Sequence, residues 1–214
     1  MLINTNEKGS TMLETLAVIC IIGVVSISGM KLIGSMFSMF KQYSVEGEIK
    51  DIYKGIRNRF SADGNYAELA EKSSEDLANE KIVPSQMYVS KQGGGKSLFH
   101  RLGGEVIIEA VGEPDVKTKE FFQVEFKGLT FRSCLSLAQL SWTDNGTSDL
   151  LAFSIYQDEG GDGGITFVLP KIKRYIAGFE GETEDFPIVT SKITEKFKDS
   201  NTSKNNFNVI WLFQ

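Results

Sequence analysis

The stretch Lys8-Gly9-Ser10-Thr11-Met12-Leu13-Glu14-Thr15-Leu16 opens an apolar run that continues to Phe40. After Glu14 the only charged residue in this run is Lys31. A bilayer core takes about 20 residues of helix, and a lysine can extend its ammonium group to the membrane surface. The sequence therefore predicts a transmembrane and assembly segment over residues 12–40.

Glu14 is the unusual residue of this run, because it places a carboxylate inside the start of a membrane segment. Such a charge costs on the order of 2.5–3.5 kcal/mol near the bilayer centre and less near the end of a helix. We therefore expect Glu14 to meet a positively charged partner. The polar leader 1–9 also differs from a secretory signal, whose small-residue cleavage site follows the apolar core.

These residues resemble the start of the type IV pilins and the related pseudopilins. Gly9 matches the glycine before the prepilin cleavage site, and Glu14 matches the glutamate that is fifth in the mature chain. The resemblance implies that prepilin peptidase cuts after Gly9 and methylates the new amine of Ser10. It implies further that Glu14 meets the N-terminal amine of a neighbouring subunit. Ser10 and the large domain are similar to the type IVb branch.

The resemblance also implies how the chain is divided. The expected parts are a prepilin leader at 1–9, an N-terminal helix at 10–60 and a globular pilin domain at 61–214. The expected fold class is α+β, with the long helix packed on an antiparallel β-sheet. The composition, with 41% apolar and 24% charged residues, is typical of a folded protein.

An amphipathic helix is predicted after Phe40. Its apolar residues recur at helical spacing with charged residues among them, and they are Val45, Ile49, Ile52, Ile56 and Phe60. We expect this stripe to pack under the protein's own sheet.

The rest of the chain is predicted to combine short helices and strands. Helices are expected at Tyr66–Asn79, Leu129–Trp142 and Thr190–Lys198, the last with Thr190 or Ser191 as its N-cap. Strands are expected at Glu105–Val111, Glu120–Phe126, Leu150–Gln157, Ile165–Leu169 and Phe207–Phe213, the first two forming a hairpin. Gly93–Gly95 marks a mobile loop rather than a phosphate cradle, which needs a preceding strand and a following helix.

The two cysteines are not expected to pair, because Cys20 lies in the membrane run and Cys134 in the outer domain. The stretches Gly103-Gly104-Glu105-Val106 and Phe126-Lys127-Gly128-Leu129 resemble type IVb pilin domains, where a later cysteine pairs with one in the last helix. Here that helix has no cysteine, and Phe197 stands near the expected place. Cys134 is then either a buried apolar residue or an intermolecular thiol, and packing around Phe197 substitutes for the bond.

Catalytic and metal-binding patterns are sparse. His100 is the only histidine, and nothing near it completes a known catalytic motif, so no enzymatic activity, catalytic residue or cofactor is expected. Asp158, Glu159 and Asp162 are weak candidates for Ca²⁺ ligands, although their spacing does not match an EF-hand and a solvated loop is favoured. The net charge of −5 argues against a nucleic-acid surface.

The function that the resemblance implies is structural. The chain would be a type IV pilus subunit that polymerises through its N-terminal helix and serves adhesion, aggregation, DNA uptake or motility. Its partners would be other pilin subunits, prepilin peptidase, the inner-membrane assembly machinery and, before assembly, membrane lipid. It would lie in the bacterial inner membrane with a periplasmic domain, and in the extracellular pilus after assembly.

Three alternatives stay open. The chain could be a minor pilin, or a pseudopilin of a type II secretion-like system. It could be a single-span anchor that carries a receptor or enzyme domain. The residues Ser26-Ile27-Ser28 before Gly29 also resemble a secretory cleavage site, but that interpretation leaves Glu14 unexplained.

Overall fold

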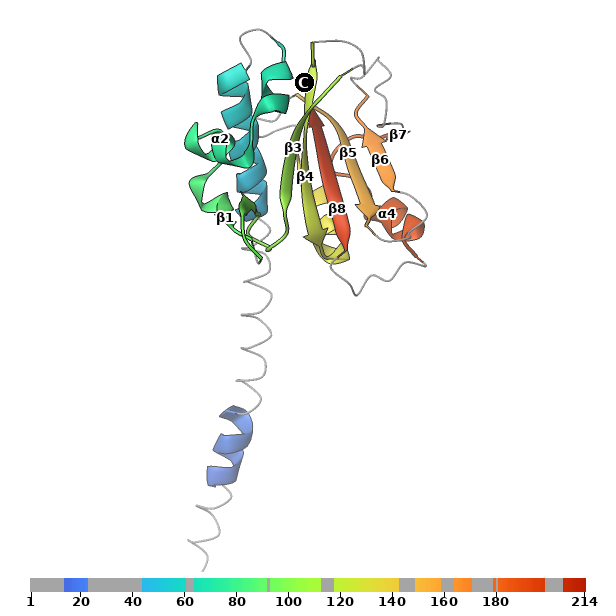
Figure 1. Cartoon of the computed structure of the whole chain (residues 1–214). Helices are drawn as coiled ribbons and strands as arrows, with labels where there is room; N and C mark the ends of the chain where they lie inside the picture. Colours follow the sequence, from blue (N-terminus) through green and yellow to red (C-terminus); the bar gives the residue numbers. More distant parts are fainter. Residues whose placement is uncertain are drawn as a thin grey trace, which may run out of the picture. The chain divides into compact units, whose positions relative to one another are not determined.

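The computed structural model describes residues 14–22, 44–60, 64–91, 93–112, 118–142, 149–158, 164–170, 179, 181–198 and 206–214. The chain forms two compact units, Met1–Lys41 and Gln42–Gln214. In the first unit, residues 14–22 are an α-helix, and in the second, residues 44–60 are an α-helix (Figure 1). The remainder of the predicted helix 10–60 lies outside the described residues.

The second unit adds short helices and strands after helix 44–60. Its described helices are η1 (Ala67–Glu71), α2 (Ser74–Asn79), η2 (Ser85–Met87), α3 (Phe131–Ala138) and α4 (Thr190–Lys196). Its described strands are β1 (Tyr88–Ser90), β2 (Lys96–Leu98), β3 (Val106–Val111), β4 (Phe121–Leu129), β5 (Leu150–Gln157), β6 (Ile165–Val168), β7 (Glu182–Thr183) and β8 (Phe207–Phe213).

The last strand of the chain lies inside the main sheet. The sheet has the order β3-β4-β8-β5-β6-β7, so β8 separates β4 from β5 and pairs antiparallel with both. The predicted β3–β4 hairpin is confirmed, and β7 runs parallel to β6. Strands β1 and β2 form a separate antiparallel pair. The predicted α+β class is therefore confirmed, with one parallel edge strand in an otherwise antiparallel sheet.

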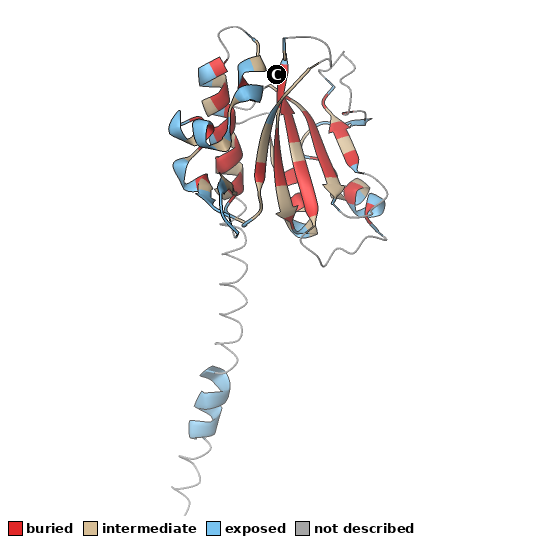
Figure 2. Ribbon diagram, viewed as in Figure 1, coloured by how far each residue is buried: buried red, intermediate tan, exposed pale blue. Residues whose placement is uncertain are grey.

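The apolar stripe of helix 44–60 forms one wall of the main core. Val45, Ile49, Ile52 and Ile56 are fully buried, as the helical spacing predicts, and Phe60 is 5% exposed (Figure 2). Alternate residues of β4 and β8 face the same cluster. Burial of each such side chain contributes roughly 1.5–3 kcal/mol, so this contact fixes the helix on the sheet.

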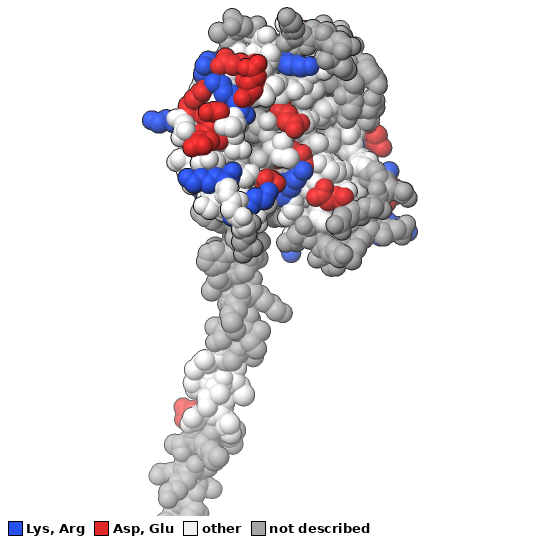
Figure 3. Space-filling view, in the orientation of Figure 1, with Lys and Arg blue, Asp and Glu red and all other residues white. Residues whose placement is uncertain are grey.

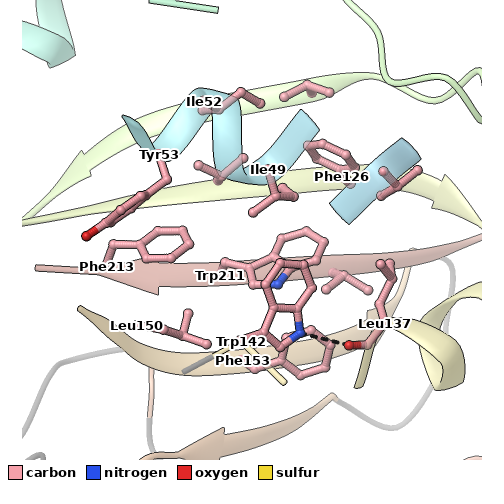
Figure 4. Close-up of a cluster of buried hydrophobic side chains, with 14 of the residues drawn as sticks. Ile49, Ile52, Tyr53, Phe126, Leu137, Trp142, Leu150, Phe153, Trp211 and Phe213 are labelled. Atoms are coloured by element: carbon pink, nitrogen blue, oxygen red, sulfur yellow. Dashed lines mark hydrogen bonds between the residues drawn. The ribbon is translucent and has the colours of Figure 1, made fainter. Parts of the chain in front are cut away.

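Aromatic side chains fill the space beneath that helix. The Trp211 ring meets the rings of Phe126, Trp142 and Phe153 edge-on, with centroids 5.4, 5.4 and 5.7 Å away (Figure 4). The indole Nε1 of Trp142 donates to the carbonyl of Leu137 at 2.8 Å. Edge-on pairs of this kind add about 0.5–1.5 kcal/mol each beyond their buried area.

A polar cluster fastens the C-terminal part of helix 44–60 to the ends of two strands. The Arg57 guanidinium lies 3.1 Å from the Asp149 carboxylate and also donates to the Tyr66 hydroxyl at 3.1 Å and the Gln214 carbonyl at 3.0 Å. The Tyr53 hydroxyl donates to the same Asp149 carboxylate at 2.7 Å. This Arg57–Asp149 clamp therefore joins the helix to the start of β5 and the end of β8.

Three predicted helices are shorter than the sequence pattern indicated, and one of them, Thr190–Lys198, ends at Lys196. The expected helix Tyr66–Asn79 is divided into η1 and α2, because Ser73 and Asp76 form a capping box that starts a new helix. The expected helix Leu129–Trp142 begins only at Phe131, because β4 extends to Leu129 and the Thr130 side chain caps Ser133.

One prediction about local structure is wrong, and one strand before a predicted loop was missed. The N-cap of α4 is Val189, without a side-chain cap, and the predicted cap Thr190 lies inside the helix, where its carbonyl accepts from the Thr194 hydroxyl. The glycines Gly93–Gly95 follow strand β1, which the sequence did not indicate, and they lead into β2. Because a strand rather than a helix follows them, the phosphate cradle is still not formed.

His100 holds the turn between β2 and β3. Its Nδ1 accepts from the backbone N–H of Leu102 at 3.1 Å, so its Nε2 carries the hydrogen and donates to the Lys127 carbonyl at 2.8 Å. The ring is 2% exposed and stacks on Phe126 with centroids 4.8 Å apart. Burial lowers the pKa of His100 below its ordinary value of 6.5, because the charged form loses water.

The clamp predicts a difference between two arginines of the same helix. Arg57→Met should lower the free energy of unfolding of the detergent-solubilised chain by about 1–2 kcal/mol, a value reduced for the partial exposure of both charges. Arg59→Met removes exposed ion pairs to Glu68 and Glu80 and the contact of the guanidinium with the Phe60 ring, whose centroid is 5.3 Å away, and should cost less, about 0.5 kcal/mol. Equal losses in urea titrations of the two variants would contradict the clamp.

His100 predicts a pH dependence of stability. Since the fold favours the neutral ring, its contribution is complete above pH 6.5 and declines as the pH falls through the lowered folded pKa. His100→Gln keeps an N–H donor but does not titrate. The difference in unfolding free energy between the parent chain and this variant should therefore shrink between pH 7.5 and 5. A difference that stays constant over that range would contradict the buried neutral ring.

Candidate functional site: an exposed apolar helix and a two-faced helix

Helix 14–22 in the first unit has apolar side chains on all sides. Every one of its described residues is exposed (Figure 2). The large apolar ones are 50–63% exposed, and they are Leu16, Val18, Ile19, Ile21 and Ile22. A helix without a polar face is normally buried in lipid or protein, and a large exposed apolar patch marks an interaction site.

Glu14 is the only charged residue of this helix. The side of the described helix that faces the viewer in Figure 3 is mostly white, the colour of uncharged residues. Gly9 and Ser10, the predicted cleavage and methylation positions, lie outside the described residues. No described helix combines the length and the apolar character that crossing a bilayer requires.

Helix 44–60 in the second unit has a second face, opposite its buried stripe. Gly47, Asp51, Lys54 and Asn58 follow one another at intervals of four, three and four residues and so lie on one side of the helix. Asp51, Lys54 and Asn58 are exposed, and Gly47 is partly exposed. We call these four residues the outer stripe.

Glu48 is a buried carboxylate between the two faces. It is 3% exposed, and it accepts from the backbone N–H of Arg101 at 3.2 Å and lies 3.3 Å from the Arg101 Nε. Burial raises the pKa of Glu48, and the contacts with Arg101 oppose that rise. The pair ties the N-terminal half of helix 44–60 to the turn that His100 organises.

The calcium candidates are only partly within the described residues. Asp158 is exposed, and its carboxylate accepts from the Asn208 amide at 3.0 Å. Glu159 and Asp162 lie outside the described residues. Among the parts of the chain that are described, no group of three or more acids, histidines and cysteines is arranged to hold a metal ion. Calcium binding stays a prediction.

A polar cluster on the sheet face away from helix 44–60 lies next to Asp158. The Tyr156 hydroxyl donates to the carboxylate of Glu125, and the ammonium group of Lys127 lies 3.6 Å from the same carboxylate. Burial, followed by the hydrogen bond to Glu125, raises the pKa of Tyr156. The groups satisfy one another, which is typical of a structural cluster.

The cysteines are both free thiols, as predicted. Cys134 has no exposed surface, and burial raises the pKa of its thiol, which favours the apolar interpretation over an intermolecular bond. The predicted packing around Phe197 is also confirmed. Its ring meets Phe131 of α3 and Phe207 of β8 edge-on, with centroids 6.0 and 5.4 Å away.

Sequence reasoning missed the outer stripe and the two polar anchors of helix 44–60. The signal for the stripe is the helical spacing of its polar positions, which is the same period that the apolar residues of that helix follow. The anchors could not, because Glu48 meets Arg101 and Arg57 meets Asp149 across long stretches of chain. Both ring nitrogens of His100 bind backbone groups, so this residue has a structural role.

No family model matches the sequence, and no curated protein matches it either. The solved structures that this chain is similar to include two pilins. The crystal structure of TcpA, a type IV pilin from Vibrio cholerae El Tor biotype, has 14% identity and a TM-score of 0.45, covering 81% of this chain and 99% of that one. The type IVb pilin from Salmonella typhi has 9% identity and a TM-score of 0.46, covering 77% of this chain and 94% of that one.

Proposed function

We propose that the chain is a structural subunit of a type IV pilus that polymerises through its N-terminal helix. The observation that carries the proposal is helix 14–22, whose large apolar side chains are all half exposed or more. Covering each of them fully is worth roughly 1.5–3 kcal/mol, so the helix has a strong tendency to associate. Lipid would cover it before assembly, and the helices of other copies would cover it in a filament.

Glu14 supports a filament over a simple lipid anchor. An anchor gains nothing from a carboxylate in its apolar helix, since the charge opposes insertion. In a filament the same carboxylate can pair with the amine of a neighbouring copy and so select one register of packing. Because the Glu14 carboxylate would meet this amine only after assembly, the pair would stabilise the assembled state.

The proposal includes the processing that the sequence implies. Prepilin peptidase removes the leader 1–9 after Gly9, and the amine of Ser10 becomes methylated. Residues 12–40 then anchor the subunit in the inner membrane, with domain 61–214 outside. The assembly machinery later adds the subunit to an extracellular pilus. Adhesion, aggregation, DNA uptake and motility are the activities that such a filament serves.

Mass spectrometry of the N-terminal peptide, from protein recovered from its native membrane, tests the processing. A methylated Ser10 supports the proposal, whereas an intact Met1 or a start at Gly29 contradicts it. Gly9→Val should leave the leader attached, because the peptidase cuts after a glycine. Gly29→Ala is the matched control and should leave a methylated Ser10 as the first residue.

Glu14→Ala tests the assembly role. This variant should be processed normally, because the cleavage site is intact, but should yield at least about tenfold fewer filaments, since each subunit loses its charge partner. The filaments sheared from cells can be measured by immunoblot and counted by electron microscopy. Glu71→Ala, which removes an exposed acid of η1, serves as the control and should assemble as the parent does. Full assembly of Glu14→Ala would refute the pairing.

A further inference from the structure

Neither space nor backbone conformation in the described part of the subunit requires a glycine at position 47. Glycine is the poorest helix former except proline, yet Gly47 lies inside helix 44–60. A Cβ atom added there would meet no atom within 4 Å. Gly55 of the same helix is different, because a Cβ there would lie 1.9 Å from the Ile82 carbonyl oxygen. The subunit itself therefore requires a glycine at 55 but not at 47.

The outer stripe also carries one acid and one base without ion pairs. Other charged residues of helix 44–60 have partners, such as Lys50 with Glu46 and Arg57 with Asp149. Asp51 and Lys54 make no ion pair with any described residue of their own chain. They are exposed and lie about one turn apart, so the stripe offers both signs of charge on one narrow surface.

We propose that the outer stripe is the docking face for helix 44–60 of a second copy of this chain, with Asp51 of one copy facing Lys54 of the next. A surface that carries both charges is complementary to itself, which favours a second copy over an acidic or a basic partner. Gly47 lies where the two helices approach most closely, because a glycine lets backbones approach without a side chain between them.

This inference rests on the proposed function and adds the orientation of neighbours to it. The contact pairs Asp51 of one copy with Lys54 of its neighbour, and so it fixes how two adjacent copies of helix 44–60 are placed. The apolar helix 14–22 supplies attraction without direction, whereas the charges of the outer stripe set which copies meet and in which register.

Substitution of Gly47 distinguishes an effect on the stability of the subunit from an effect on assembly. Gly47→Ala should leave the melting temperature of the detergent-solubilised chain unchanged or raise it, because alanine favours the helix and the methyl group enters open space. The same variant should lower filament yield, and Gly47→Leu should lower it further. Parent-level yields from both variants would overturn the close approach at Gly47.

Charge reversal tests the pairing directly. Asp51→Lys and Lys54→Asp each place like charges opposite one another, so each should reduce filament yield at least about tenfold. The double variant, which exchanges the two residues, should restore assembly. Glu71→Lys reverses an exposed charge elsewhere and should leave the yield unchanged. A double variant as defective as either single one would overturn the proposal.

Cross-linking distinguishes a contact between copies from one within a helix. In a Cys20→Ser background, chains with Asp51→Cys and chains with Lys54→Cys are expressed together and oxidised in intact filaments. Disulfide-linked dimers should be abundant in the mixture and scarce when either variant is expressed alone. Their absence from the mixture would overturn the docking face.

Two outcomes distinguish the docking face from the proposed function. If the parent chain enters no filament in its native cells, the proposed function itself fails. If parent and charge-reversed chains assemble alike, only the docking face fails.

Discussion

The contact between the apolar stripe of helix 44–60 and strand β8 is the constraint on which the second unit depends. Phe207, Val209, Trp211 and Phe213 of β8 all belong to the core cluster that contains the stripe. Because β8 is also paired on both sides, to β4 and to β5, its position holds the two halves of the sheet together. The sheet can be complete only when the last strand of the chain is in place. The helix is therefore anchored by residues far from it in sequence, and its own stability depends on the whole unit.

In this arrangement the two faces of helix 44–60 have different roles. Its buried stripe, the Glu48–Arg101 pair and the Arg57–Asp149 clamp fix it to the sheet at both ends. The outer stripe is then presented on a rigid support, since the residues that hold the helix are not those that it exposes. An interface built on a rigid element loses little conformational entropy on binding. A fixed helix is therefore better suited to set the register of neighbours than a flexible segment would be.

Local patterns were enough to predict the core and most of the strands. The stripe from Val45 to Phe60 has a strong helical period, and the strands have β-branched and aromatic residues between turn signals, so each signal lies within a short window. The errors arose where a single hydrogen bond decided the outcome, as at Ser73, which ends one helix by starting another. The place of β8 between β4 and β5, and the anchors of helix 44–60, were not predictable because they depend on pairings between distant segments. The cleavage and methylation positions came from resemblance alone, and they lie outside the described residues.

Helix 14–22 and the outer stripe of helix 44–60 differ in the kind of interaction that they can make. Helix 14–22 is apolar on all sides, and hydrophobic attraction is proportional to area and has no preferred direction. A bundle held by such surfaces alone could slide or rotate with little change in free energy. Charges change this, because a carboxylate gains from an ammonium group at one position and loses from a carboxylate at the next. Glu14 and the Asp51 and Lys54 pair lie in separate parts of the chain, so between them they would fix both the axial position and the rotation of each subunit. Glu14, Asp51 and Lys54 are therefore the residues that would give the assembly a defined geometry.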